Sequence, residues 1–212
     1  MSVLTAGNDP ARTNYGTERL AALTDGVFAI TLTLLVLDLK VPHVAGGSEQ
    51  VLREELVALI PNAVAWLVSF VLLARFWIIH HMVLETLERV ELRTIIYNFG
   101  VLMLISLVPF ATALLGTYEF EIGPVVVFST VMALTGLATG LFASHAVTHP
   151  AMNRPHVRPL LRWHSRYHSI GIPIFAVFAI AMTLLAHPVL ALIAWLGEPA
   201  IALTLRVIRA RQ

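Results

Sequence analysis

Long runs of apolar residues alternate with short polar segments along almost the whole chain. A membrane-spanning helix needs about 20 mostly apolar residues. Six runs meet this requirement and predict helices over 19–40, 54–80, 94–118, 122–148, 167–187 and 188–208, the last interrupted by Glu198 and Pro199. The pattern predicts an all-α integral membrane protein with one six-helix domain over residues 1–212.

The composition supports this class. Hydrophobic residues make up 58% of the chain and charged residues 13%, with a mean hydropathy of +0.80. An average soluble domain is about 45–50% apolar and about 25% charged. The net charge of +1 gives no reason to expect a nucleic-acid partner, and the absence of cysteine excludes disulfides and thiolate chemistry. The polar start, Met1–Glu18, leads us to expect no cleaved signal peptide.

Basic residues predict the orientation in the membrane, because they prefer the cytoplasmic side. If both termini lie on the same side as loops 82–93 and 149–166, that side carries eleven arginines, and the other side only Lys40 and Arg53. We therefore expect a multi-pass protein of the cell membrane, surrounded by the lipid bilayer, with both termini in the cytoplasm. The eleven are Arg12, Arg19, Arg89, Arg93, Arg154, Arg158, Arg162, Arg166, Arg206, Arg209 and Arg211.

The first predicted helix carries ionisable residues at membrane depth. Arg19 and Asp25 lie close together, and only twelve uncharged residues separate Asp25 from Asp38. Such groups are costly inside a membrane unless they face protein or water, so they are candidates for function. Asp25 needs a partner there: Arg19, or a histidine or hydroxyl from another helix.

Helical spacing divides the same helix into two faces. At 100° per residue, Ile30, Leu34 and Leu37 fall within a stripe of about 60°, and Thr24 and Asp25 point away from it, towards the bundle. By pattern alone the stripe is more typical of helix packing or lipid contact than of a pore, and Asp25 is more typical of a structural hydrogen-bonded clamp than of direct ion binding. The stripe continues through Arg19, Leu23 and Gly26, with Thr33 at its edge.

The start of this helix resembles a known signature, namely Arg, three residues, then Phe-Ser-Asp. The chain has Arg19 and Asp25 at the matching positions, with Leu23 in place of Phe and Thr24 in place of Ser. Thr24 keeps the hydroxyl, whereas Leu23 lacks the ring. The signature is that of the transmembrane protein 175 family, potassium channels of lysosomes and bacteria.

Two further stretches also resemble this family. One is 76–81, which ends in His80 and His81, and the other is 98–116, which begins at Asn98. The resemblance covers the first three predicted helices through these motifs, and the remaining three only through their hydropathy.

The resemblance implies a homotetramer of six-helix subunits in which the first helix of each lines a central pore permeable to potassium ions. It places the hydrophobic constriction at Ile30, Leu34 and Leu37, with Thr33 as a polar contributor. It also implies that the signature residues Arg19, Leu23, Thr24 and Asp25 belong to a clamp with His80, His81 and Asn98 as partners. Neither enzymatic activity nor a cofactor is implied.

The sequence is also compatible with two other functions. The adjacent His80 and His81, with the pairs His145/His149 and His164/His168 each four residues apart, are compatible with a membrane metalloenzyme. Against it, no histidine stands two or three residues before His80, and few carboxylates are near, so we expect no metal. Alternatively, Asp25, the histidines and Glu198 would serve a proton-coupled transporter.

Overall fold

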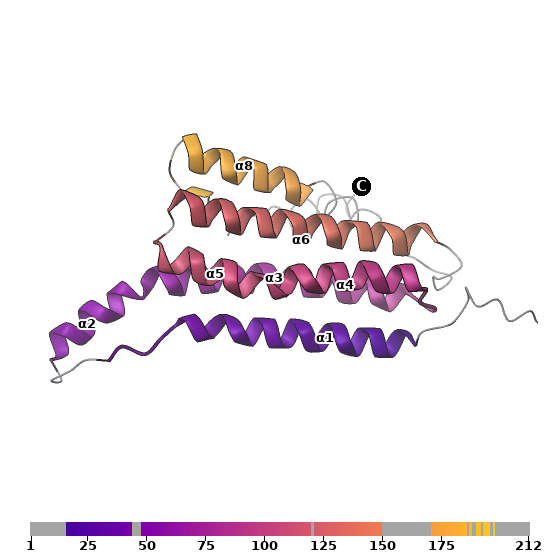
Figure 1. Ribbon diagram of the computed structural model, residues 1–212, viewed down its shortest axis with the longest axis horizontal. Coiled ribbons are helices and arrows are strands. Elements are labelled where there is room, and N and C mark those ends of the chain that lie inside the picture. Colours follow the sequence, from indigo (N-terminus) through magenta and orange to yellow (C-terminus); the bar gives the residue numbers. More distant parts are fainter. Residues whose placement is uncertain are drawn as a thin grey trace, which may run out of the picture.

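The computed structural model describes residues 16–43, 48–119, 121–149 and 171–185, with the separate residues 187, 190, 191, 193–195 and 197. The predicted sixth helix, 188–208, lies largely outside the described residues, as do Glu198, His164 and His168. All regular elements of the described part are helical (Figure 1). They are α1 (Thr17–Leu34), η2 (Leu35–Asp38), α2 (Glu49–Ala58), α3 (Ile60–Thr86), α4 (Leu92–Ser106), α5 (Val108–Thr117), α6 (Ile122–Thr148) and α8 (Ile172–Leu185).

Four helical segments of the described part are long and apolar enough to cross a membrane. They are Thr17–Asp38, Glu49–Thr86, Leu92–Thr117 and Ile122–Thr148. The shorter apolar helix α8 falls within the predicted fifth span. The second segment differs most from its expected range, 54–80, because it continues to Thr86 where a loop was expected. The chain is thus an all-helical, multi-pass membrane protein.

Two of these segments are interrupted where a proline follows. Leu59 separates α2 from α3, whose second residue is Pro61, and Leu107 separates α4 from α5, whose second residue is Pro109. Proline lacks the backbone N–H that would continue the helical ladder, and its ring clashes with the preceding turn, but it fits the first turn of a new helix. In each segment a new helix therefore begins one residue before the proline.

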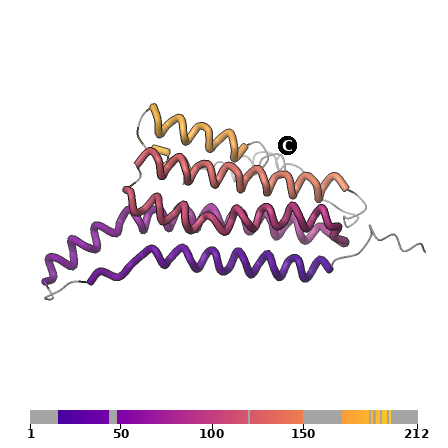
Figure 2. Tube along the Cα trace, viewed as in Figure 1, coloured from indigo at the N-terminus to yellow at the C-terminus, as the bar shows by residue number. Residues whose placement is uncertain are grey.

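The helices pack side by side, with α1 at one edge and α8 at the other (Figure 2). α6 packs against α8, α4 and α5, while α3 packs mainly against α5 and α1. Large side chains such as Phe28 of α1 and Phe128 and Phe142 of α6 are fully buried between the helices. On the side away from α3 and α4, no described element covers α1.

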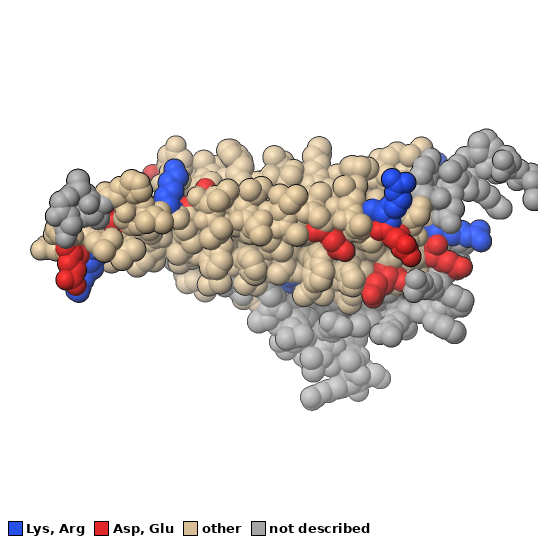
Figure 3. All heavy atoms as spheres, turned by 90° about the horizontal axis from the view of Figure 1, so that it is seen from below, with Lys and Arg blue, Asp and Glu red and all other residues tan. Residues whose placement is uncertain are grey.

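Charged side chains lie mainly towards the two ends of the molecule, with a broad uncharged surface between them (Figure 3). One end carries α2 and the turn between α5 and α6, and the other carries the start of α1 and the connection between α3 and α4 (Figure 1). An uncharged belt between charged ends is what a bilayer requires of a spanning bundle.

Candidate functional site

The inner face of α1 is held by a buried polar network on two other helices. Thr24, which is 1% exposed, meets Asn98 of α4, which is fully buried. Asn98 Nδ2 donates to Thr24 Oγ1 at 3.1 Å, and Thr24 Oγ1 donates to Asn98 Oδ1 at 3.2 Å. His80 Nε2 of α3 lies 2.7 Å from Asn98 Oδ1, and it must be the donor because an amide oxygen only accepts. One amide therefore ties α1, α3 and α4 together.

The His80 ring is fixed by aromatic packing as well as by Asn98. It stacks on Phe142 of α6 with ring centroids 4.4 Å apart and planes 4° apart, and it lies 5.9 Å from Phe28 of α1. His80 Nδ1 is buried and has no hydrogen-bond partner among the described residues. Rings packed on both helices leave the histidine little freedom, so Asn98 and Thr24 are held in register.

Asp25 takes a different partner from those expected. The indole Nε1–H of Trp77 on α3 donates to Asp25 Oδ1 at 2.8 Å, a length typical of a hydrogen bond to a carboxylate. Within the described part of the chain, no ion pair joins Arg19 to Asp25. His81 lies outside this contact, 3.3 Å from Glu85 and stacked on the Trp77 ring. Asp25 is thus hydrogen-bonded to Trp77, and not to any of the partners expected from the sequence.

The opposite face of α1 and of its continuation η2 is open, and we call this surface the open face of α1. Ile30, Leu34 and Leu37 are 61%, 43% and 67% exposed. Arg19 and Leu23 are exposed on the same side. Thr33 is also exposed, and its hydroxyl donates to the backbone oxygens of Ala29 and Ile30 at 3.1 and 2.8 Å. With its proton used in this way, the Thr33 oxygen presents only lone pairs outward.

α1 thus combines an anchored polar face with an exposed aliphatic face. Phe28 and Leu35 are buried against the bundle together with Thr24. The side chains that the helical wheel groups into a stripe all lie on the uncovered side. The geometry can hold one helix rigidly while presenting an apolar surface along its length.

The described histidines do not assemble a metal site. No group of three or more His, Asp or Glu side chains with suitable spacing occurs in the part of the chain that the structure describes. His145 and His149 lie close, with ring centroids 4.3 Å apart, but His149 Nδ1 donates to the backbone oxygen of His145 at 2.8 Å. These two rings give no support for a metalloenzyme.

Fold and site together define a class: a multi-pass helical membrane protein whose first helix is clamped on one side and apolar on the other. The family model described as the endosomal/lysosomal potassium channel TMEM175 matches residues 19–109. That range includes the network and the open face of α1. The chain belongs to the TMEM175 family.

Individual relatives agree with this assignment. A potassium channel of Streptomyces collinus is 35% identical over 191 residues, which cover 82% of this chain and 89% of the relative. A potassium channel of Chamaesiphon minutus is 40% identical over 102 residues, 48% of this chain and 50% of the relative. The crystal structure of a lysosomal potassium-selective channel TMEM175 homologue from Chamaesiphon minutus superimposes with a TM-score of 0.73 at 27% identity, covering 90% of this chain and 97% of that one. The predicted family is thereby confirmed.

Proposed function

We propose that this protein is a potassium-permeable channel in which four copies surround a central pore lined by the open face of α1. Ile30, Leu34 and Leu37 form the hydrophobic constriction, and Thr33 adds a polar oxygen beside it. The observation that carries this proposal is the exposure of these aliphatic side chains on a helix anchored on its other side. The names of the relatives support potassium as the permeant ion.

The chemistry of such a pore follows from its side chains. Rings of aliphatic residues gate by dewetting, because a narrow apolar neck holds little water until it widens. An ion must then shed part of its hydration to pass, and the cost depends on the width of the neck. The polar network holds α1 rigidly, and a rigid α1 keeps the width of the neck constant.

The clamp in this proposal consists of Thr24 with Asn98 and His80, and of Asp25 with Trp77. Leu23 and Arg19, also part of the family signature, lie on the open face, so we assign them to contacts made in the assembly. The clamp fixes the rotation of α1, and rotation decides which side chains face the pore. A change of one residue in register would turn the aliphatic stripe by about 100°.

Orientation and location are part of the same proposal. The arginine-rich side, with both termini, faces the cytoplasm, and the end that carries α2 faces outward. The excess of basic residues on one side supports this arrangement. The bacterial origin of the relatives favours the cell membrane.

The experiment is ion flux from liposomes that contain the purified protein, with potassium, sodium and proton gradients applied in turn. We expect passive potassium flux that follows the gradient. No cation flux under any of the three gradients would overturn the proposal. Saturable uptake that requires a proton gradient would replace it with the transporter.

A further inference from the structure

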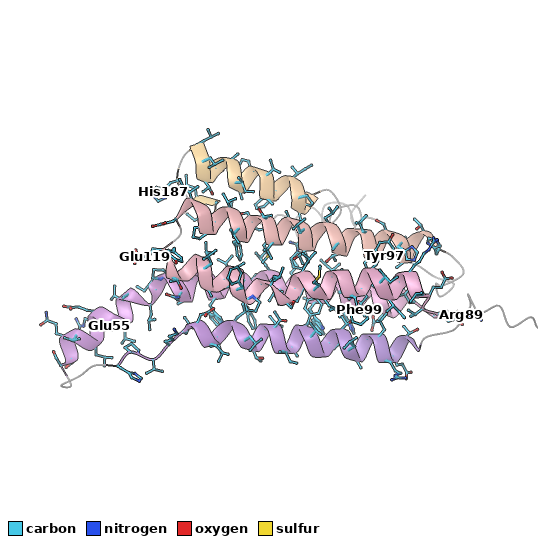
Figure 4. All side chains as sticks on the ribbon, viewed as in Figure 1. Glu55, Arg89, Tyr97, Phe99, Glu119 and His187 are labelled. Carbon is cyan, nitrogen blue, oxygen red and sulfur yellow. The ribbon has the colours of Figure 1, made fainter. Side chains whose placement is uncertain are left out.

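α2 (Glu49–Ala58) stands apart from the rest of the bundle. None of its residues is buried, and of the described elements only α3, its own continuation, contacts it substantially. Figure 1 shows it projecting past the end of α1, and Figure 4 places its Glu55 at the opposite end of the molecule from Arg89. A ten-residue helix without packing is marginal in water. No described part of the chain other than α3 supplies substantial packing for it.

Depth places α2 outside the bilayer. The bond between Asp25 and Trp77 marks one level on two helices that run in opposite directions. From that level, 13 residues lead along the first span to Asp38, about 20 Å at 1.5 Å per residue. Along the second span, 28 residues lead from Trp77 back to Glu49, about 42 Å. α2, which carries the charged residues Glu49, Arg53, Glu54 and Glu55, therefore lies beyond the end of the first span and outside the hydrocarbon of the bilayer.

Despite this position, α2 carries an aliphatic stripe. Leu52 and Leu56 are 41% and 52% exposed and lie about 40° apart on the helix, and Ile60, the first residue of α3, is 54% exposed and extends the same side. Val51 and Val57, 42% and 57% exposed, lie outside this stripe. Glu49 ends the stripe at the free tip of the helix. An aliphatic stripe on a projecting helix outside the hydrocarbon is typical of a surface that a partner covers.

The charges beside the stripe indicate which partner. Arg53 lies on one flank of the stripe and Glu55 on the other. Copies arranged around a closed ring meet head to tail, so that one flank of each copy faces the opposite flank of the next. A basic flank against an acidic flank is the complementarity such a ring needs, and flanking charges of this kind set the pairing of adjacent helices.

We propose that α2 docks on the α2 of a second copy of this chain, so that the projecting helices form a collar around the outer mouth of the channel. Leu52, Leu56 and Ile60 pack inside the collar, and Arg53 of each copy pairs with Glu55 of the next. This inference rests on the proposed tetramer. It adds an interface outside the membrane that holds the outer end of the assembly together.

Cysteine cross-linking tests the collar. The chain has no cysteine of its own, so only the introduced thiols can react. The double variant Arg53→Cys/Glu55→Cys places one thiol on each flank, and these two positions lie too far around the helix to join within one chain. In membranes, a short bifunctional thiol reagent should yield a ladder up to four linked copies. The control Gln50→Cys/Val57→Cys places both thiols on the face away from the stripe, about 10 Å apart along the helix and so beyond the reach of a short reagent within one chain, and should yield none.

Native mass spectrometry of the same double variant, without the reagent, separates this inference from the tetramer. Four copies by mass with a cross-linked ladder support the collar. Four copies by mass without any linked product would overturn the collar and leave the tetramer standing, with α2 lying against another surface such as lipid headgroups. A single copy by mass would overturn both.

Discussion

At the scale of single residues, two neighbours on α1 bind two different helices. Thr24 joins the amide of Asn98 on α4, whereas Asp25 accepts from the indole of Trp77 on α3. Because each contact fixes the same short stretch of α1 from another direction, the pair restrains both the position and the rotation of the helix. These contacts are local, so single substitutions report on them.

Thr24→Val tests the buried hydroxyl. The substitution keeps the shape of the side chain but leaves Asn98 Nδ2 buried without its acceptor, which should cost about 1–3 kcal/mol of unfolding free energy. Thr33→Val on the same helix removes an exposed hydroxyl that bonds only its own backbone, and should change stability by less than about 0.5 kcal/mol. Thermal unfolding in detergent, followed by circular dichroism, compares the two. Equal losses would mean that the network does not anchor α1.

A double-mutant cycle on Asp25 and Trp77 tests the second contact. Asp25→Ala and Trp77→Phe each remove one partner of the same hydrogen bond, so the double variant should lose less stability than the two single losses added together. We expect a coupling energy of about 1–2 kcal/mol, as for other contacting pairs, from denaturant titrations. Strictly additive losses would show that the bond contributes nothing.

Residue contacts of this kind were only partly predictable. A polar group at membrane depth needs a partner, so partners for Thr24 and Asp25 could be expected. Asn98 does bond Thr24, and His80 bonds Asn98. Trp77 was not expected as the partner of Asp25 because its indole counts as apolar in a hydropathy pattern, although its N–H is a hydrogen-bond donor. Nothing local to the sequence says which of several donors on α3 faces α1, since that depends on the rotation of both helices.

At the scale of elements, close helix packing depends on glycine at a few positions. A Cβ on Gly136 of α6 would lie 2.5 and 2.8 Å from two carbons of Ile172 on α8. A Cβ on Gly123, near the start of the same helix, would meet nothing within 4 Å. Close packing therefore explains the glycine at position 136 but not the glycine at position 123, although both lie in α6.

Gly136→Ala should destabilise the protein by about 1–3 kcal/mol, because overpacking forces the two helices to shift. Gly123→Ala should have no such cost, since alanine favours the helix and finds open space. Gly136→Ala/Ile172→Ala should lose less stability than Gly136→Ala and Ile172→Ala added together, because the shorter side chain removes the clash. Thermal unfolding measures all four variants. An equal effect at both glycines would rule out tight packing of α6 against α8.

The boundaries of the elements show what hydropathy can and cannot reveal. The range 122–148 predicted from the apolar run is the range of α6. α2 begins at Glu49, before the predicted range 54–80, because its charged first residues end an apolar run without ending a helix. The restarts at Pro61 and Pro109 follow from the chemistry of proline, which a count of apolar residues ignores.

At the scale of the whole molecule, a single chain is incomplete in two places. The open face of α1 and the stripe on α2 both present aliphatic side chains with no described part of the chain over them. In the proposed tetramer the first faces a pore and the second a neighbouring copy. One assembly thus accounts for both surfaces, and the fold of one chain supplies the rigid support between them.

Selectivity is the property of the assembly that the pore assignment predicts. Ile30 on α1 and Ile96 on α4 are matched, since they are 61% and 60% exposed in the single chain. Only Ile30 lines the proposed pore. An amide at that position would keep the neck wet and reduce the cost of passing an ion with its hydration shell.

The most direct measurement is the ratio of potassium to sodium flux in liposomes for the unchanged protein, Ile30→Asn and Ile96→Asn, with assembly checked by size-exclusion chromatography. We expect Ile30→Asn to bring the ratio close to one, whereas Ile96→Asn retains the original ratio. An unchanged ratio in correctly assembled Ile30→Asn would contradict the assignment of the α1 face to the pore, as would an equal loss in both variants.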